Sequence, residues 1–316
     1  MNRPIYQDKV LFPKLLWTRP VQLYLPEAGK ILILAGSKGM TGIAILACEA
    51  VFRSGTGILL LGFPESLKKI YKNILPPAMA LELPETKNQT LSKKAEKLVI
   101  SNAENCNAII IGPGLSRNAE TMELVWKLIS KIDNPIILDD AGIHALKNGI
   151  KAILLSKDEA YLTQYFANKK GSLIITATLS EIRNIANALN LDRKYTNLYI
   201  KEHLEEIIRI IAKKLSCIIV AKGVNTTILT NTGDIIINRL DGLKTATDDI
   251  NSVLSSVIGS FIAQNPGNID EAITVATYIY DLSKKLALSN INKKKPITVS
   301  DIIHYIPKSI KMSEAE

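Results

Sequence analysis

Short apolar runs rich in isoleucine recur along the chain and alternate with longer segments of helical periodicity. The apolar runs are continuous, which is typical of strands that are covered on both faces of a sheet. They lie at 31–34, 58–61, 109–111, 136–138, 173–175 and 218–220. The helical segments lie at 42–53, 119–132, 179–189 and 201–214. This alternation predicts an α/β fold with a doubly wound, mostly parallel sheet, helices on both faces and ligands at the carboxyl ends of the strands.

The remaining segments complete the predicted organisation. Apolar runs at 226–230 and 234–238 flank Asn231-Thr232-Gly233 and predict a β-hairpin. Residues 249–263 and 270–288 predict helices. No internal repeat or long linker divides the 316 residues, so we expect a single nucleotide-binding domain at 29–307, preceded by an amino-terminal extension at 1–28 and followed by a tail at 308–316.

Composition narrows the class of protein. The hydrophobic fraction is 47%, yet no uninterrupted apolar stretch reaches the length of a membrane span. The amino terminus from Met1 to Lys14 mixes charges with prolines, which argues against a signal peptide. Cys48, Cys106 and Cys217 are isolated within apolar runs, which indicates buried free thiols in a reducing compartment. We therefore expect a soluble cytoplasmic protein without a membrane partner.

The distribution of charge and the spacing of the histidines argue against two further classes of protein, those that bind nucleic acid and those that hold a metal centre. The net charge of +9 comes from scattered lysines, and the aromatic residues, 5% of the chain, are not interleaved with them. This pattern favours a basic surface over a nucleic-acid interface. His144, His203 and His304 share no spacing with each other or with paired carboxylates, so we expect no metal centre. Asp139 and Asp140 follow a predicted strand and leave two uses open, which are capping of the next turn and magnesium binding.

Three loops that follow predicted strands suit a close approach of the backbone to a ligand. They are residues 36–42, the segment Gly112-Pro113-Gly114-Leu115 and the segment Lys222-Gly223-Val224-Asn225-Thr226. Glycines in such loops allow main-chain amides to face an anion at a helix amino terminus. A single glycine-rich turn between a strand and a helix is explained equally well by turn geometry alone, so the three loops carry weight only together.

Together these loops resemble those of the carbohydrate-kinase-like, ADP-dependent NAD(P)H-hydrate dehydratases. Segments 53–57, 76–79, 138–140 and 298–302 extend the resemblance in the same order, from about Gly29 to Pro307. The resemblance implies a ribokinase-like fold, ADP or ATP with magnesium as cofactor, hydrated NADH or NADPH as the dinucleotide substrate, and a homo-oligomer, namely a tetramer. It implies nucleotide binding by Lys222, Gly223, Val224, Asn225, Thr226 and Asn251, and substrate binding by Ile43, Gly114, Thr178 and Ser252.

The stretch that resembles the catalytic segment departs from the family pattern. The family carries Thr-Gly-Gly-Ser-Gly-Asp-Val-Leu at a helix amino terminus, where the glycines bind phosphate and the aspartate is the base that activates the hydrate hydroxyl for phosphoryl transfer. Residues 247–254 here read Thr-Asp-Asp-Ile-Asn-Ser-Val-Leu. Ser252 therefore occupies the base position, and a serine hydroxyl is a poor general base near neutral pH. Asp248 or Asp249 is expected to cap this helix, and Asp249 is also a candidate substitute base.

Two further departures affect the expected cofactor pocket. Thr178 stands where the family has the histidine of Thr-Pro-His-Pro-Gly-Glu, and Ile43 replaces a small alanine. The sequence therefore predicts a dehydratase by descent whose activity is weakened or lost. One alternative is a non-catalytic homologue that binds a nucleotide or dinucleotide or serves as a partner subunit. Another is a small-molecule kinase of the ribokinase type, which would lack the same aspartate and glycines.

Overall fold

The computed structural model of the protein describes residues 3–17, 25–74, 78–189, 194–223, 225–239, 252–290 and 297–314. The strands in this part of the chain are β1 (Ile5–Gln7), β2 (Lys30–Leu34), β3 (Ile58–Pro64), β4 (Met79–Leu83), β5 (Ala108–Ile111), β6 (Ile136–Leu138), β7 (Leu173–Thr178), β8 (Cys217–Lys222), β9 (Thr227–Leu229) and β10 (Ile235–Asn238). They form one sheet in the order β1-β10-β9-β8-β7-β6-β5-β2-β3-β4.

Thirteen α-helices are found among the described residues. They are α1 (Lys14–Trp17), α2 (Thr41–Ser54), α3 (Lys68–Ile74), α4 (Glu96–Ala103), α5 (Ala119–Lys131), α6 (Ala141–Ser156), α7 (Glu159–Ala167), α8 (Leu179–Leu189), α9 (Asn197–Glu202), α10 (Leu204–Leu215), α11 (Ser252–Gln264), α12 (Ile269–Asn290) and α13 (Val299–Ser313). Short 3-10 turns occupy η1 (Leu25–Ala28), η2 (Glu65–Leu67) and η3 (Lys93–Ala95). No described helix combines the length and the apolar character that crossing a membrane requires.

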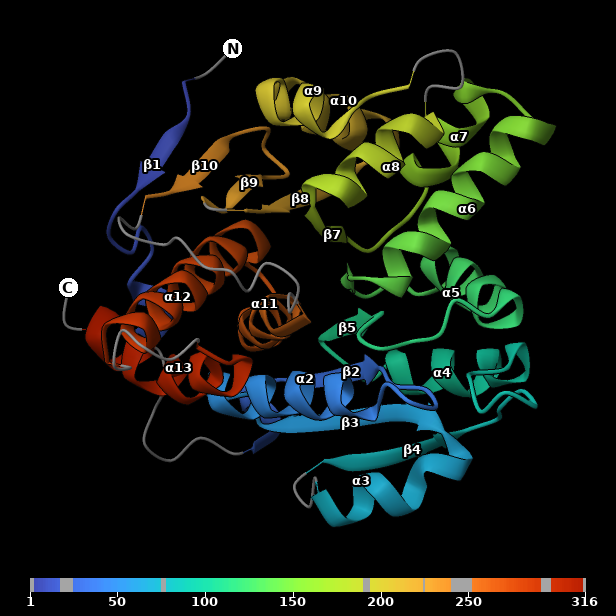
Figure 1. Ribbon diagram of the computed structural model, residues 1–316, viewed down its shortest axis with the longest axis horizontal. Coiled ribbons are helices and arrows are strands. Elements are labelled where there is room, and N and C mark those ends of the chain that lie inside the picture. The colour runs from blue at the N-terminus through green and yellow to red at the C-terminus, as the bar shows by residue number, and fades with distance from the viewer. Residues whose placement is uncertain are drawn as a thin grey trace.

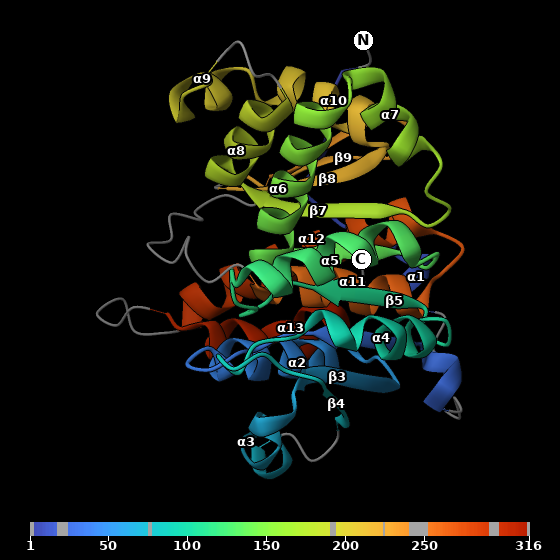
Figure 2. The same ribbon diagram turned by 90° about the vertical axis from the view of Figure 1, so that its right-hand side faces the viewer.

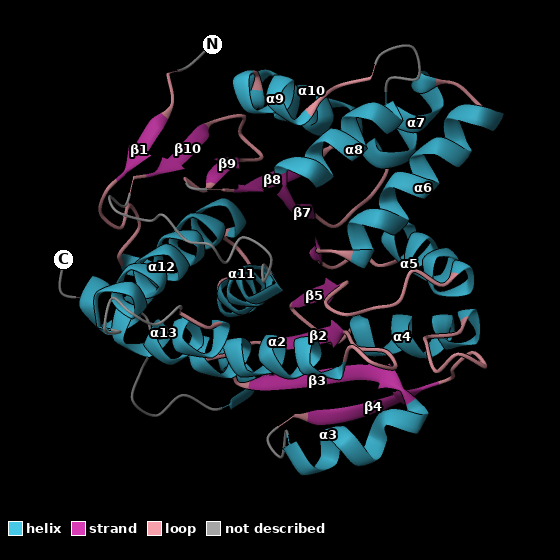
Figure 3. Cartoon of the chain, viewed as in Figure 1, coloured by secondary structure: helices cyan, strands magenta, loops and turns pink. Residues whose placement is uncertain are grey.

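Helices cover both faces of the sheet (Figures 1 and 3). Helices α2, α11, α12 and α13 pack together on one face, and α4, α5, α6, α8 and α10 lie over the other (Figure 2). The described strands pair in parallel except where β9 joins β8 and β10. The predicted doubly wound, mostly parallel α/β fold is therefore confirmed.

The two-sided burial of the sheet explains its uninterrupted apolar strands. Successive side chains of a strand point to opposite faces. In β2, Ile31 and Ile33 therefore pack into the core beneath α2 and α11, whereas Leu32 and Leu34 pack into the core beneath α4 and α5. All four side chains are fully buried. A strand with one solvated face would have shown polar residues at every second position.

Most of the predicted elements are present, with shifts at their ends. The six apolar runs are β2, β3, β5, β6, β7 and β8, and the hairpin runs are the antiparallel pair β9 and β10. The helix expected from 249 begins in the described residues at Ser252. Strand β1 lies within the segment expected as an extension and pairs with β10. The division of the chain into one domain with an extension and a tail stays a prediction.

Candidate functional site

The first two glycine loops contact each other at the carboxyl ends of β2 and β5. The backbone amide of Gly36 donates to the carbonyl of Pro113 at 2.9 Å, and Ser37 Oγ donates to the carbonyl of Gly114 at 2.9 Å. Gly114 has a φ of +64°, and a Cβ atom there would lie 2.7 Å from the Met40 carbonyl and 3.3 Å from Ile43 Cβ. Ile43 and Gly114, both predicted to bind substrate, are therefore neighbours.

Asp139 connects the second loop to the third. It follows β6, and its carbonyl oxygen lies only 1.7 Å from where a Cβ atom of Gly112 would be, so that position admits no side chain. Its Oδ1 atom lies 2.6 Å from Nζ of Lys222, the last residue of β8. The loops that begin at Gly36, Gly112 and Lys222 thus meet at one end of the sheet, which is where a doubly wound fold binds its ligands.

The second carboxylate oxygen of Asp139 reaches helix α11. Ser255 Oγ donates to Asp139 Oδ2 at 2.7 Å, and the side chains of Ser255, Asp139 and Lys222 are all buried. Helix α11 begins at Ser252, so the position that carries the catalytic aspartate in the resembling family lies about one helical turn before Ser255. A single carboxylate therefore joins the end of β6, the end of β8 and the first turns of α11.

Thr178 is used to cap a helix. It pairs in register with Lys222 across β7 and β8. Its backbone amide and its Oγ1 donate to Glu181 Oε2 at 2.8 and 2.9 Å, and the amide of Glu181 donates back to Thr178 Oγ1 at 3.3 Å. These reciprocal bonds satisfy amides at the start of α8. Burial raises the pKa of Glu181, and the ammonium of Lys222 opposes that rise.

Asp140 does not cap the turn that follows it, which was one of the two uses that the sequence left open for the Asp139–Asp140 pair. It precedes α6 with a φ of +39° and makes no side-chain capping bond. Its carboxylate lies 3.5 Å from the guanidinium of Arg117. Burial raises the pKa of Asp140, and the adjacent Asp139 charge adds to the rise. No group of three or more metal-ligating side chains occurs among the described residues. Both carboxylates pair with cationic side chains of the protein, Asp139 with Lys222 and Asp140 with Arg117.

Thr226, the last residue of the predicted nucleotide loop, is also bonded within the protein. Its side chain is buried and hydrogen-bonds the carboxyl of Asp281 in α12. Asp281 Oδ2 accepts a second bond from Asn238 Nδ2 at 2.8 Å. Burial raises the pKa of Asp281, while the charge of Lys284 and these hydrogen bonds oppose the rise. Asn225 is exposed and Gly223 half-buried, so this part of the loop remains accessible.

Part of the predicted site lies outside the described residues. This holds for Val224, Asp248, Asp249 and Asn251, and for the side chain of Ser252. Sequence reasoning did not find Ser255 or Asp281, because a single polar residue within an apolar helix gives no signal of a partner elsewhere. The sequence did single out Asp139 as one of two carboxylates directly after a predicted strand, but its partners were not predicted.

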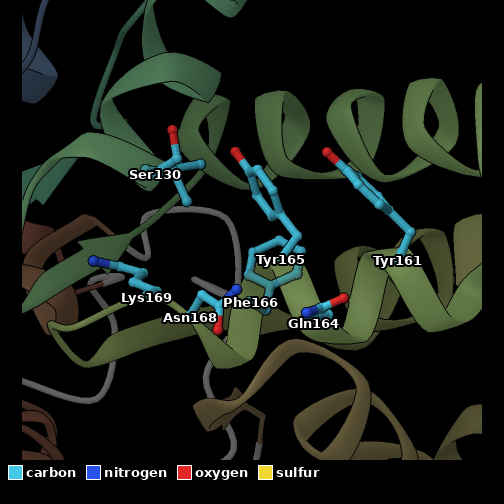
Figure 4. A pocket seen from close by; sticks show the side chains of 8 residues that line it. Ser130, Tyr161, Gln164, Tyr165, Phe166, Asn168 and Lys169 are labelled. Carbon is cyan, nitrogen blue, oxygen red and sulfur yellow. The ribbon is translucent and has the colours of Figure 1, made fainter.

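A separate cavity of about 420 Å³ lies between α5 and α7 (Figure 4). Tyr161 and Tyr165 line it, and their hydroxyls point to the same side. Lys169 Nζ donates to the carbonyl of Ile132 at 2.7 Å, and burial lowers the pKa of Lys169 to about 8. None of the residues predicted to bind nucleotide or substrate lines this cavity. The candidate site is therefore the meeting point of the three loops.

The parallel sheet and the loops at its carboxyl edge define a ribokinase-like α/β protein. The family described as NAD(P)H-hydrate dehydratase matches residues 31–308, and the chain belongs to this family.

Relatives agree with this assignment over nearly the whole chain. The ADP-dependent (S)-NAD(P)H-hydrate dehydratase of Lactococcus lactis is 23% identical over 309 residues, covering 97% of this chain and 98% of its own. The bifunctional NAD(P)H-hydrate repair enzyme Nnr of Moorella thermoacetica is 24% identical over 290 residues, 91% of this chain but 50% of its own. The chain thus spans about half the length of the first curated relatives it matches.

A solved structure is similar to the whole fold. It is the ADP/ATP-dependent NAD(P)H-hydrate dehydratase of Bacillus subtilis, co-crystallized with ATP and Mg²⁺. It superposes with a TM-score of 0.74 at 20% sequence identity and covers 99% of each chain. At this identity the likeness establishes the ribokinase-like architecture and not the chemistry of the site.

Proposed function

We propose that this chain is an ADP-dependent NAD(P)H-hydrate dehydratase by descent, with weak or lost activity and a retained nucleoside site. Family membership and the junction of the three loops at Asp139 support the descent. The observation that carries the loss of activity is Ser252, the first residue of α11, at the position where the family has its aspartate.

The expected loss follows from the chemistry of the base position. A hydroxyl group has little affinity for a proton near neutral pH, so Ser252 cannot take the proton of the hydrate hydroxyl. Removing a positioned base costs roughly 10²–10⁴-fold in rate. Replacing the glycines of this segment by Asp248, Asp249 and Asn251 removes anion donors, which costs a comparable factor. The two losses concern the same phosphoryl transfer and are therefore expected to be coupled.

The described polar side chains fit a nucleoside better than a polyphosphate. ADP or ATP with magnesium is the cofactor that the family implies, and hydrated NADH or NADPH the substrate. Yet the ammonium of Lys222 is paired with Asp139, and the hydroxyl of Thr226 is bonded to Asp281. The backbone around Gly223 and Asn225 remains for contact with a ligand. Thr178 caps α8 rather than presenting an imidazole to the substrate.

The proposal is tested by incubating the purified chain with hydrated NADH or NADPH, magnesium and either ADP or ATP. The return of the absorbance of the reduced ring reports turnover. We expect little or none, while the Lactococcus lactis relative under the same conditions provides the positive control. Robust turnover by the unmodified chain would contradict the proposed loss. Alanine substitution of Asp249 and of Asp139 would then identify the carboxylate that replaces the missing base.

We also propose that the chain forms a homo-oligomer, a tetramer by resemblance to the family. The support is the family assignment alone, so the state of the chain in solution is an independent measurement. Light scattering on the eluting protein gives its mass directly, to be compared with the chain mass of 34.7 kDa. A monomer across a wide concentration range would contradict this part of the proposal.

A further inference from the structure

We propose that Lys222 is an internal counter-ion rather than a phosphate ligand, and that Asp139 is the positioning residue that holds Lys222 and helix α11 together. This inference rests on the proposed function, because it assumes that the loop from Lys222 to Thr226 faces a bound nucleotide. It predicts a site that binds a nucleoside or a nucleoside monophosphate and gains little from further phosphates.

The contact uses the whole carboxylate of Asp139. Oδ1 accepts from Lys222 Nζ at 2.6 Å and from the backbone amide of Asp140 at 3.0 Å, and Oδ2 accepts from Ser255 Oγ at 2.7 Å. Hydrogen bonds between charged partners at this length are among the strong ones in proteins. Because bonds from β8, from the residue before α6 and from α11 meet on this carboxylate, Asp139 cannot follow Lys222 toward a ligand without breaking the others.

Burial makes the ion pair costly to separate. The side chain of Lys222 is 5% exposed and that of Asp139 is 2% exposed. A buried charge that loses its partner is left without compensating solvent, which is much more unfavourable than losing an exposed ion pair. A phosphate that recruited the ammonium of Lys222 would leave the Asp139 carboxylate in that state. Nucleotide binding is therefore expected to leave the pair intact.

The charge around Lys222 disfavours a polyphosphate. Besides Asp139, the carboxyls of Asp140 and Glu181 lie close enough for the charge of Lys222 to lower their pKa values against the rise that burial causes. Arg117 is the second cation of this group and pairs with Asp140 from a largely exposed position. Among the described residues, the carboxyls of Asp139, Asp140 and Glu181 surround the ammonium of Lys222, so each added phosphate meets negative charge and gains little affinity.

The test compares the affinities of adenosine, AMP and ADP by calorimetry for the wild type, Asp139→Asn and the double variant Lys222→Met with Asp139→Asn. Asp139→Asn keeps the shape and hydrogen-bonding capacity of the side chain but removes its charge. We expect the wild type to bind ADP and adenosine within about threefold of each other. The double variant, which removes both charges of the pair and leaves no unpaired carboxylate, should keep that ratio. Freeing the ammonium in Asp139→Asn should raise the preference for ADP about tenfold, the effect of one charge-assisted bond.

A matched control tests whether removing a partly buried lysine elsewhere in the protein also changes the ratio of ADP to adenosine affinity. Lys169 donates its ammonium to a backbone carbonyl in the cavity between α5 and α7 and is half-buried. Lys169→Met should leave the ratio of ADP to adenosine affinity unchanged. If the double variant Lys222→Met with Asp139→Asn bound ADP tenfold or more weakly than the wild type while adenosine binding stayed the same, Lys222 would be a phosphate ligand and the inference would be wrong.

A double-mutant cycle keeps the inference testable even if no nucleotide binds. Lys222→Met, Asp139→Asn and the double variant are unfolded with denaturant. We expect each single change to raise the unfolding constant about a hundredfold or more, and the double variant to recover most of that loss. Additive effects would overturn the counter-ion role. A strong coupling together with no binding of adenosine, AMP or ADP would instead contradict the proposed nucleotide site.

Discussion

The carbonyl oxygen of Asp139 lies against Gly112 so closely that a Cβ atom on Gly112 would be 1.7 Å from it. Gly112 also has a φ of +138°, which residues with a side chain rarely adopt. Glycine at this position of the second loop therefore lets the backbone of Asp139 lie where its carboxylate can bind both Lys222 and Ser255. The close approach explains why this loop needs glycine here, whether or not an anion binds to it.

Gly112→Ala should therefore destabilise the fold strongly. We expect a loss of about 3 kcal/mol or more in the free energy of unfolding, because the new methyl group forces the Asp139 backbone to move in addition to the cost of the backbone conformation. Gly39→Ala is the matched control, since Gly39 also has a positive φ of +83° but has open space around it. It should cost roughly 1 kcal/mol. Equal losses in denaturant unfolding would show that the contact with Asp139 is unimportant.

The fold was largely predictable because its strands are covered on both faces. Each such strand leaves an unbroken apolar run, as in β2, and the glycine loops follow those runs directly. The partners of Asp139 were not predictable, because Lys222 is 83 residues and Ser255 116 residues away in the sequence. Hydrophobic periodicity identifies elements, but it does not say which polar residue of one element meets which residue of another.

The first strand, β1, could not be predicted from the sequence either. β1 has only three residues, and it is recognisable only by its pairing with β10. Gln7 within it is fully buried, and its Nε2 donates to Asn238 Oδ1 at 2.9 Å and to the Thr274 carbonyl at 3.1 Å. A short edge strand that is fixed by a side-chain network cannot be distinguished from a loop by composition.

Gln7→Ala should destabilise the protein by about 1–3 kcal/mol, because it leaves the buried Asn238 Oδ1 and Thr274 carbonyl without their donor. The exposed Lys9, just after β1, provides the control, and Lys9→Ala should change the free energy of unfolding by less than about 0.5 kcal/mol. Denaturant unfolding of both variants makes the comparison. A loss for Gln7→Ala no larger than that of the control would mean that β1 does not contribute to the stability of the sheet.

The buried carboxyl of Asp281 should make the stability of the folded protein depend on pH. Burial raises its pKa above the ordinary value of an aspartate, despite the charge of Lys284 and the hydrogen bonds from Asn238 and Thr226. A carboxyl whose pKa is higher in the folded state binds a proton more readily there than in the unfolded chain. It therefore makes the folded protein more stable as the pH falls through the raised pKa, and this gain is lost as the pH rises again.

Asp281→Asn should remove this dependence, since the amide keeps the shape of the side chain without titrating. Between neutral and mildly acidic pH, the wild type should gain stability relative to Asp281→Asn, with a slope of at most about 1.4 kcal/mol per pH unit. Denaturant unfolding of both proteins across that range measures the difference. Parallel pH profiles would show that Asp281 does not titrate differently in the folded and unfolded states.

The last prediction concerns recovery of dehydration. Ser252→Asp alone should give little activity, because the restored base would still lack the anion donors that the family glycines supply. The combined change Asp248→Gly, Asp249→Gly, Asn251→Gly and Ser252→Asp should restore ADP-dependent turnover, measured by the absorbance of the reduced ring. The three glycine changes without Ser252→Asp provide the control and should stay inactive. Equal activity in the combined variant and this control would show that position 252 does not carry the base.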